Sequence, residues 1–341
     1  MDGTSPAAPR VVLQDGQRRR WLCFGEPICV LKAESTDQVL AALHEAEQAV
    51  EAEGLYAAGL VAYEAAPSFD PVLKVRAQPD LPLLWLGLFL APEVWSDLPG
   101  TALAHTLGTW GPAIDRATYH QAIAAIKEQI AAGYTYQINY TFPLGAAFNG
   151  EPWPLFLQLA SAQRGRYAAY VDTGRHVVCS ASPELFFQRA DGVLTSRPMK
   201  GTAPRGRTFT EDEAQRAWLF ASEKNRAENV MIVDMIRNDM GRIAEVGSVR
   251  VPALFEVERY PTVLQMTSTV TSRTNASVAE VFKALFPCAS ITGAPKVSAM
   301  GIIADLEPAA RGVYTGAIGY LAPGGRAQFN VAIRTVVVDR Q

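Results

Sequence analysis

The chain has 341 residues, with 31 basic and 34 acidic side chains, so its formal net charge is −3. Apolar residues make up 49% and charged residues 19%, which is typical of a globular chain and not of a disordered or fibrous one. The slight acidic excess argues against nucleic acid as a partner, because nucleic-acid binders concentrate basic residues. No apolar run approaches the roughly 20 residues of a membrane helix, and no signal peptide is visible, so we expect no membrane contact and a cytoplasmic location.

The first part of the chain predicts strands around one amphipathic helix. Ser35 and Gln38 have the spacing of a capping box, which starts a helix, and Gly54 is typical of the residue that ends one. Between them, apolar side chains recur at the spacing of a helix face. The apolar runs 55–65 and 81–91, each bounded by Gly or Pro, predict buried strands.

The pattern changes after a Gly- and Pro-rich stretch at 108–115. A helix is expected over about 117–132, where apolar residues line one face and a glycine follows. From 136 to 142 the period becomes two, which predicts a strand. One face of this predicted strand carries two amides and a hydroxyl, from Gln137, Asn139 and Thr141.

The second half of the chain predicts a long helix and a terminal pair of strands. Thr210 and Glu213 have the spacing of a second capping box, which predicts a helical region from there to about Arg242. Near the C-terminus, two apolar segments flank the turn signal at 323–325. Helices and Gly-bounded strands follow one another without a regular βαβ rhythm, so the expected fold class is α+β.

Three polar segments beside apolar ones are candidates for chemistry. Glu184 precedes an apolar strand, and Lys200 stands next to a glycine, where backbone can approach a ligand closely. Asn225 and Glu228 share one face of the long helix. Residue type alone also allows a loop lysine and two surface ion pairs. The four histidines are far apart in the sequence, which argues against a histidine-based triad or metal centre.

Eight segments, in one order along most of the chain, resemble the chorismate-utilising enzymes and, among them, component I of aminodeoxychorismate synthase. The resemblance implies an α+β fold like that of anthranilate synthase component I, with mixed β-sheets in a sandwich and flanking helices. Eight ordered matches are more specific than any one motif. They are YEAAPSFDP (63–71), YQINYT (136–141), SPELFF (182–187), PMKGTAPRG (198–206), EKNRAENVMIVDMIRNDMGRI (223–243), SITGAPK (290–296), YTGAIGY (314–320) and FNVAIRT (329–335).

Two positions distinguish branches of this family. Members that add water to chorismate carry a basic lysine at the position of Gln137, and a neutral amide cannot act as a general base. Anthranilate synthases carry an alanine at the position of Lys200, whereas a lysine is typical of the aminodeoxychorismate branch. The resemblance therefore implies a transferase that converts chorismate and ammonia to 4-amino-4-deoxychorismate, for p-aminobenzoate and folate biosynthesis.

The resemblance also implies roles for individual residues. Lys200 would attack C2 of chorismate as a neutral amine and form a covalent intermediate. Glu184 would protonate the C4 hydroxyl, which otherwise leaves poorly. Glu228 would be a ligand of Mg²⁺, the implied cofactor, which would hold the ring carboxylate. The residues implied in substrate binding are Thr202, Ser290, Gly293, Tyr314, Arg334 and Gln137.

Ammonia requires a source, and no glutaminase signature is visible in the chain, so the resemblance implies a separate glutamine amidotransferase subunit. It divides the chain into an N-terminal α+β segment (1–110) and a chorismate-binding catalytic domain (111–341). Family members continue beyond the position of Gln341, so we expect the catalytic domain to lack its C-terminal end. Two alternatives stay open: anthranilate synthase component I, and a truncated, inactive remnant that binds the amidotransferase.

Overall fold

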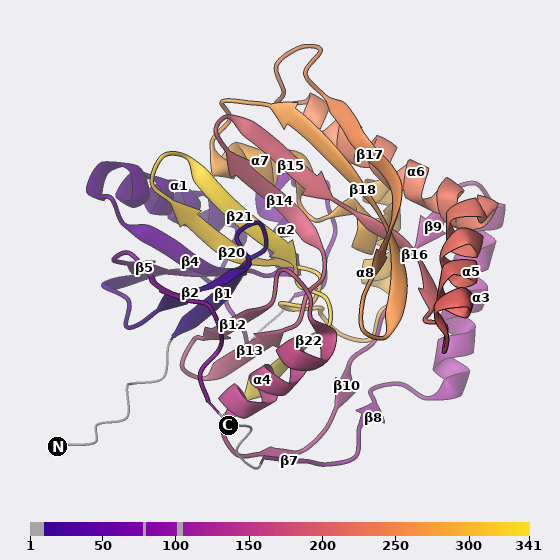
Figure 1. Ribbon diagram of the computed structural model, residues 1–341, viewed down its shortest axis with the longest axis horizontal. Helices are drawn as coiled ribbons and strands as arrows, with labels where there is room; N and C mark the ends of the chain where they lie inside the picture. Colours follow the sequence, from indigo (N-terminus) through magenta and orange to yellow (C-terminus); the bar gives the residue numbers. More distant parts are fainter. Residues whose placement is uncertain (1–9, 78–79, 101–104) are drawn as a thin grey trace.

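The computed structural model describes residues 10–77, 80–100 and 105–341, in which two large β-sheets pack against each other with helices on their outer sides (Figure 1). The smaller of the two has six antiparallel strands in the order β22-β13-β12-β1-β2-β6. Its strands are β1 (Val11–Asp15), β2 (Arg20–Phe24), β6 (Glu93–Trp95), β12 (Ala169–Asp172), β13 (His176–Ser180) and β22 (Thr335–Asp339).

The larger sheet has ten strands in the order β16-β18-β15-β14-β21-β20-β4-β5-β3, and β17 pairs with β18 beside this path. All of its pairings are antiparallel. Its strands are β3 (Cys29–Ala33), β4 (Tyr56–Val61), β5 (Leu84–Phe89), β14 (Leu185–Ala190), β15 (Val193–Arg197), β16 (Met199–Pro204), β17 (Arg250–Arg259), β18 (Val263–Arg273), β20 (Ala317–Ala322) and β21 (Arg326–Val331).

Shorter elements connect the sheets. None of the helices in the described parts of the chain has the length and apolar character needed to cross a bilayer. The α-helices are α1 (Thr36–Glu53), α2 (Ala66–Phe69), α3 (Arg116–Ala131), α4 (Pro152–Gln163), α5 (Phe209–Ala221), α6 (Glu223–Gly241), α7 (Val278–Leu285) and α8 (Lys296–Leu306), with 3₁₀ turns η1 (Tyr63–Ala65) and η2 (Ala289–Ile291). Three small strand pairs are β8 (Gly111–Pro112) with β10 (Leu144–Gly145), β7 (Thr106–Leu107) with β11 (Phe148–Asn149), and β9 (Gln137–Ile138) with β19 (Gly293–Ala294).

Alternation along the strands produces three apolar layers. On β1, Val11 and Leu13 face the larger sheet, whereas Val12 packs with Phe156 of α4 on the opposite side. The outer face of the larger sheet is covered by α1, α6 and α7, whose side chains form the largest apolar cluster with it. Both sheets are therefore buried on two faces over much of their area, which accounts for the continuous apolar runs in their sequences.

The terminal pair of strands and the first helix are confirmed, but the details of the helix ends differ from the predictions. Gly54 ends α1 in the left-handed conformation, with φ 70°. The predicted capping box does not form, because the Ser35 side chain makes no capping bond and Gln38 accepts from the Glu34 amide instead. At the turn between β20 and β21, Gly324 and Gly325 adopt φ values of 78° and 65°, which favour glycine.

The predicted long helix is two helices with a different start. The capping box that forms joins Thr208 and Glu211, because the chain is still extended at Thr208 and becomes helical directly after it. Glu213, predicted for this role, pairs instead with Arg216 and Arg259. The helix is interrupted at Ser222, which has ψ 110° and whose hydroxyl accepts the amide of Asn225 at the start of α6.

The predicted strand over 136–142 is mostly wrong. Only Gln137–Ile138 pairs as a strand, and Tyr136 is exposed. The backbone beyond Ile138 finds other partners: the amide of Asn139 donates to the carbonyl of Thr292, and that of Thr141 donates to the Glu307 carboxylate. Period-two alternation thus marks an extended segment whose hydrogen bonds are irregular.

Strands from both sides of the predicted boundary at 110 belong to both large sheets. In the larger sheet β4 pairs with β20, and in the smaller sheet β1 pairs with β12. The two-part division of the chain stays a prediction, and any division must leave these shared sheets intact.

We expect Phe282→Ala to lower the free energy of unfolding by about 3–5 kcal/mol, because it leaves a cavity at the centre of an aromatic cluster. Urea denaturation followed by tryptophan fluorescence measures the loss. Phe209→Ala is the matched control, since that ring is 80% exposed, and it should cost less than about 1 kcal/mol. Equal losses would contradict the placement of α7. Five rings lie with their centroids 5.1–5.9 Å from that of Phe282: Phe69, Phe186, Phe187, Phe286 and Phe329.

Candidate active site

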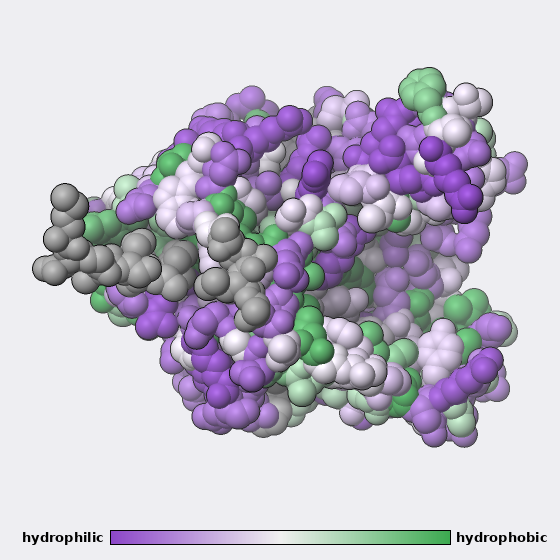
Figure 2. Space-filling model, turned by 60° about the horizontal axis from the view of Figure 1, so that its bottom comes forward, coloured by the Kyte–Doolittle hydropathy of each residue, from purple (hydrophilic) through white to green (hydrophobic). Residues whose placement is uncertain are grey.

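Three predicted site residues, Lys200, Glu184 and Gln137, lie on or beside strands at one end of the larger sheet and in the β9–β19 pair. Lys200 is on β16, Glu184 directly precedes β14, and Gln137 is on β9. Figure 1 shows β9 and β16 on the side of the molecule that carries α3 and α5. Figure 2 shows that the molecule is deeply hollowed on this side, between an upper and a lower lobe. The chain therefore brings segments far apart in sequence to one concave region.

Glu184 is a buried carboxyl, only 2% exposed. Its Oε1 accepts the backbone N–H of Met199 at 3.3 Å, and its own amide donates to the Ser182 hydroxyl at 3.2 Å. Burial raises the pKa of Glu184 to about 7, against the opposing effects of a hydrogen bond from Ser290 and the charge of Lys200. A carboxyl with this pKa can give up and take back a proton near neutral pH.

Lys200 is half-buried, and its Nζ donates to the side-chain oxygen of Asn139 at 3.3 Å. Burial lowers the pKa of Lys200, while the charges of Glu184 and Glu228 oppose this shift. Gly201, at φ 96°, lets the strand approach α6 closely, because a Cβ there would lie 3.0 Å from Cβ of Asn225.

The charges of Lys200 and Glu184 act on each other, yet burial shifts both groups toward their neutral forms. A neutral amine is a nucleophile and a neutral carboxyl is an acid, so the pair combines two functions that are difficult to combine in water. One hydrogen bond links the two segments: the backbone amide of Met199, which precedes Lys200 in the chain, donates to the Glu184 carboxyl.

The segment from Cys288 to Gly293 forms a wall of the site. Ser290 is buried, and its hydroxyl lies 3.2 Å from the Cys288 sulfur and hydrogen-bonds Glu184. Gly293 faces Ile138 across the β9–β19 pair. A Cβ at Gly293 would lie 2.1 Å from the Gln137 carbonyl oxygen, so only glycine permits this approach.

The three other predicted binding side chains are those of Arg334, Thr202 and Tyr314. Arg334 donates to Gln163 at 2.6 Å, and its charge offsets a small part of the burial-driven rise in the pKa of Glu184. Thr202 is exposed on β16, and its hydroxyl donates to Gln265. Tyr314 is 37% exposed, and burial of its ring raises the pKa of its hydroxyl. Among the described residues, no hydrogen bond joins any of the three directly to Lys200 or Glu184.

Glu228 does not form a metal site with its protein neighbours. Its side chain is 34% exposed and lies 3.9 Å from Lys224, one helical turn away. Within the described parts of the chain, no group of three or more His, Cys, Asp or Glu side chains is arranged to hold a metal ion. Mg²⁺ prefers six oxygen ligands, so Glu228 alone does not fit it, and its predicted role as a ligand stays a prediction.

Two residues that touch the site were not among the predicted functional residues. Asn139 contacts Lys200, and its position on the amide face with Gln137 was the only available signal in the sequence. The Arg311 side chain is only 3% exposed, pairs with Glu307 at 2.7 Å, and donates to the carbonyls of Asn139 and Ile291. Nothing in the spacing of a lone arginine indicates such a position.

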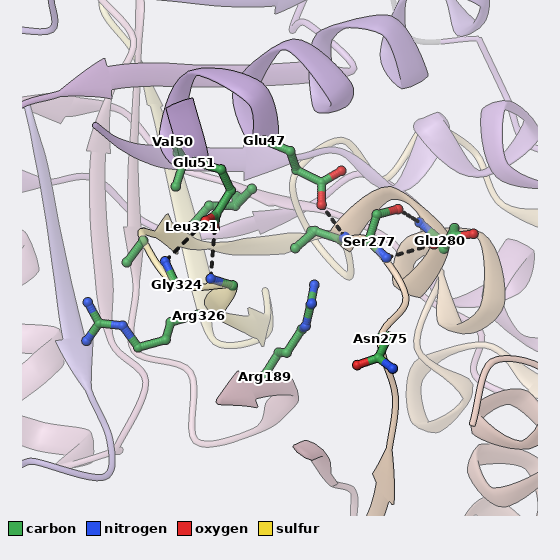
Figure 3. Close-up of a pocket in the computed structure, with 13 residues that line it drawn as sticks. Glu47, Val50, Glu51, Arg189, Asn275, Ser277, Glu280, Leu321, Gly324 and Arg326 are labelled. Atoms are coloured by element: carbon green, nitrogen blue, oxygen red, sulfur yellow. Dashed lines mark hydrogen bonds between the residues drawn. The ribbon is translucent and has the colours of Figure 1, made fainter. Parts of the chain in front are cut away.

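A separate cavity of about 520 Å³ lies between α1, α7 and the β20–β21 turn, and none of the predicted site residues line it (Figure 3). Its carboxylates are already engaged: Glu47 accepts from the amide of Val278, and Glu51 accepts from the amides of Gly324 and Gly325. These bonds hold helix ends and a turn in place, which is a structural role.

The family model for chorismate binding enzymes matches residues 96–341, which include every residue of the site. The chain belongs to this family. The match confirms the resemblance and spans seven of the eight sequence segments, all but 63–71.

Curated relatives divide between two activities by name. Aminodeoxychorismate synthase component 1 of Klebsiella aerogenes is 41% identical over 261 residues, which are 76% of this chain and 56% of the relative. The protein of that name from Escherichia coli (strain K12) is 40% identical, over 67% of this chain and 51% of the relative. Anthranilate synthase component 1 of Streptomyces coelicolor is 38% identical, over 73% of this chain and 50% of the relative. The chain thus spans about half the length of these curated relatives.

Solved structures of family members share the fold. Anthranilate synthase component I from Streptococcus pneumoniae TIGR4 aligns over 100% of this chain and 86% of its own, with a TM-score of 0.81 and 24% identity. The menaquinone-specific isochorismate synthase from Escherichia coli aligns over 99% and 83%, with a TM-score of 0.76 and 20% identity. The predicted α+β sandwich with flanking helices is therefore confirmed.

We expect Glu184→Gln to stabilise the protein increasingly as the pH rises. The folded chain binds the Glu184 proton more tightly than the unfolded chain, so wild-type stability falls relative to the variant as the pH rises from 4.5 to about 7. The variant's advantage in melting temperature should be small below pH 4.5 and complete above about pH 7. Thermal unfolding across this range measures it, with Glu53→Gln at the exposed end of α1 as the control. A pH-independent difference would contradict the burial of Glu184.

Proposed function

We propose that this chain acts as component I of aminodeoxychorismate synthase, converting chorismate and ammonia to 4-amino-4-deoxychorismate and water. The observation that carries the proposal is a half-buried amine, Lys200, next in the chain to the residue whose amide holds the buried Glu184 carboxyl, with the pKa of each group shifted toward its neutral form. The names of the relatives at 40–41% identity support the same activity. A lysine at position 200 also favours aminodeoxychorismate formation over anthranilate formation, since anthranilate synthases carry an alanine there.

In the first step, the neutral Lys200 amine attacks C2 of chorismate. A bond forms between Nζ and C2, the ring double bonds shift, and the C4–oxygen bond breaks. Glu184 donates its proton to the departing hydroxyl, which leaves as water. The products of this step are a cationic secondary amine on Lys200 and an ionised Glu184.

In the second step, ammonia attacks C4, the double bonds shift back, and the bond between C2 and Nζ breaks. Lys200 leaves as a neutral amine, and the Glu184 carboxylate takes one proton from the added ammonium group. Both residues return to their starting protonation states, so the cycle balances as chorismate plus ammonia giving aminodeoxychorismate plus water. A pKa of about 7 suits a group that must act once as acid and once as base.

Gln137 supports ammonia over water as the second nucleophile. Among the described residues its side-chain oxygen is one of few buried polar atoms with no hydrogen-bond partner. An amide oxygen can accept an N–H from incoming ammonia but cannot remove a proton to activate water. The unpartnered acceptor thus fits a nucleophile that needs orientation and no activation.

The rest of the assembly belongs to the same proposal. Thr202, Ser290, Gly293, Tyr314 and Arg334 are proposed to surround chorismate, with Arg334 as a partner for a carboxylate. A glutamine amidotransferase subunit is the proposed source of ammonia, since ammonia released to solvent is mostly protonated. Chorismate-utilising enzymes generally use Mg²⁺. No step of the proposed reaction depends on Mg²⁺, because Glu228 alone does not fit the ion.

Product analysis separates this proposal from its alternatives. The chain is incubated with chorismate, Mg²⁺ and ammonium chloride near pH 8, and products are identified by chromatography and mass spectrometry. Aminodeoxychorismate without pyruvate supports the proposal. Anthranilate with an equal amount of pyruvate would assign the chain to anthranilate synthase, the name of the relative at 38% identity. No turnover with ammonium, and no chorismate binding by calorimetry, would indicate a remnant.

We expect Lys200→Ala to reduce aminodeoxychorismate formation at least about 100-fold, because the covalent step is lost. Intact-mass spectrometry of wild-type protein quenched during turnover should show an adduct on one lysine, absent from the variant. Lys127→Ala, on the exposed face of α3, is the matched control and should retain activity and adduct. An adduct that persists in Lys200→Ala would show that another group is the nucleophile.

A further inference from the structure

Asn139 uses all of its polar groups in contacts with segments that form the site. Its backbone amide donates to the carbonyl of Thr292 at 2.9 Å, and its backbone carbonyl accepts from Arg311 at 2.7 Å. Its side-chain nitrogen donates to the carbonyl of Ser290 at 3.2 Å, and its side-chain oxygen accepts from Nζ of Lys200 at 3.3 Å. A half-buried residue with four such partners has little freedom to turn.

These contacts determine which end of the amide faces Lys200. The carbonyl of Ser290 can only accept a hydrogen bond, so the NH₂ end must point toward it. The oxygen must then point toward the lysine, whose N–H groups can donate to it both as an ammonium and as an amine. The protein thus presents a neutral acceptor to the amine, in one orientation.

The backbone of Asn139 is itself held by a buried ion pair. Arg311 donates to the carbonyls of Asn139 and Ile291, while Glu307 pairs with Arg311 and accepts the amide of Thr141. Separating Arg311 from Glu307 would leave a buried charge without a partner, which is costly in free energy, so the two side chains stay in place. The segment that contacts Lys200 and the segment that carries Ser290 are fastened to the same guanidinium group.

We propose that Asn139 is a positioning residue for the Lys200 amine, which holds one N–H of that amine through its side-chain oxygen and ties it to the Ser290 segment. This inference rests on the proposed function for its effect on turnover. An amine that donates this hydrogen bond directs its lone pair away from Asn139. The hydrogen bond also restricts rotation about the terminal carbon–nitrogen bond of Lys200. Orientation of a nucleophile before attack lowers the entropic part of the barrier.

The charge on the acceptor matters because of what else surrounds the amine. The titratable groups near Lys200 are Glu184 and Glu228, whose negative charges favour its charged form, and Cys288, whose thiol stays neutral because burial raises its pKa to about 12. A third carboxylate at position 139 would favour the ammonium further, whereas a neutral amide orients the amine without this effect. The side-chain type at 139 therefore has two separable consequences, orientation and charge.

Two variants separate these consequences. Asn139→Leu removes the acceptor at similar size, and Asn139→Asp keeps an oxygen acceptor but adds a negative charge. Asn149→Asp, an exposed site on β11, is the matched control. Steady-state rates with chorismate and ammonium are measured from about pH 7 to about pH 9. In the same protein without chorismate, acetic anhydride labelling of Lys200, read by peptide mass spectrometry, reports the fraction of neutral amine.

For Asn139→Leu we expect kcat to fall at least about tenfold, while KM stays within about threefold of the wild-type value. The ratio of the variant's kcat to that of the wild type should be the same at every pH. For Asn139→Asp we expect the ratio of the variant's kcat to the wild-type kcat to rise by up to about tenfold from pH 7 to pH 9. A nearby carboxylate raises the pKa of an amine by about one unit or more, so the variant has less neutral amine at the lower pH. The labelling midpoint of Lys200 should rise by a similar amount, and Asn149→Asp should change neither measurement.

Two results would overturn the inference: an Asn139→Leu variant with kcat within threefold of wild type, or an Asn139→Asp variant with an unchanged labelling midpoint. A loss of melting temperature with both pH profiles unchanged would indicate a purely structural role and would overturn it as well. Failure of the proposed function is distinguishable, since wild-type protein would then form no aminodeoxychorismate while the labelling experiment would still test the contact between Asn139 and Lys200.

Discussion

Burial of an amine and a carboxyl in one place is the constraint on which the rest of this site depends. In water Lys200 would be an ammonium and Glu184 a carboxylate, and neither would be reactive in the way the proposed chemistry requires. Burial favours the uncharged form of both, because charged groups lose more solvation than neutral ones. The cost of this burial is reduced by hydrogen bonds from Ser290 and Met199 to Glu184, and from Lys200 to Asn139.

The support for that pair comes from several layers of the fold. β14 and β16, which carry or adjoin the two groups, are separated in the larger sheet by β15 and β18. Helix α6 packs behind β16, where Asn229 lies within 3.5 Å of the Lys200 carbonyl and accepts from Ser268 of β18. On the other side, Arg311 binds the carbonyls of the two loop segments. The site is thus built from irregular segments, and a rigid sheet, a helix and one ion pair determine their positions.

Some features of the chain follow from local sequence, and the structure confirms them. Gly54 ends α1, and the glycines after Pro323 form the turn between β20 and β21, because only glycine adopts these backbone angles readily. The predictions failed where a distant partner competed with a local one. Ser35 and Gln38 have capping-box spacing without the bonds, and the 136–142 segment gives its backbone hydrogen bonds to Thr292 and Glu307 instead of to a neighbouring strand.

In the site, too, some features follow from the local sequence and others depend on distant partners. Glu184, Lys200 and Gln137 are identifiable in the sequence because they stand in segments that resemble a known family, and the chain does belong to it. By itself the sequence determined the residue types, the family and the α+β fold, since these depend on local pattern and on ordered motifs. Only the tertiary structure decided that Asn139 contacts Lys200, that Arg311 binds two loops, and that, within the described residues, Glu228 belongs to no group of three metal-ligating side chains. The reason is physical: hydrogen-bond partners and desolvation depend on which side chains meet in space, and no spacing along the chain encodes a contact 151 or 172 residues away.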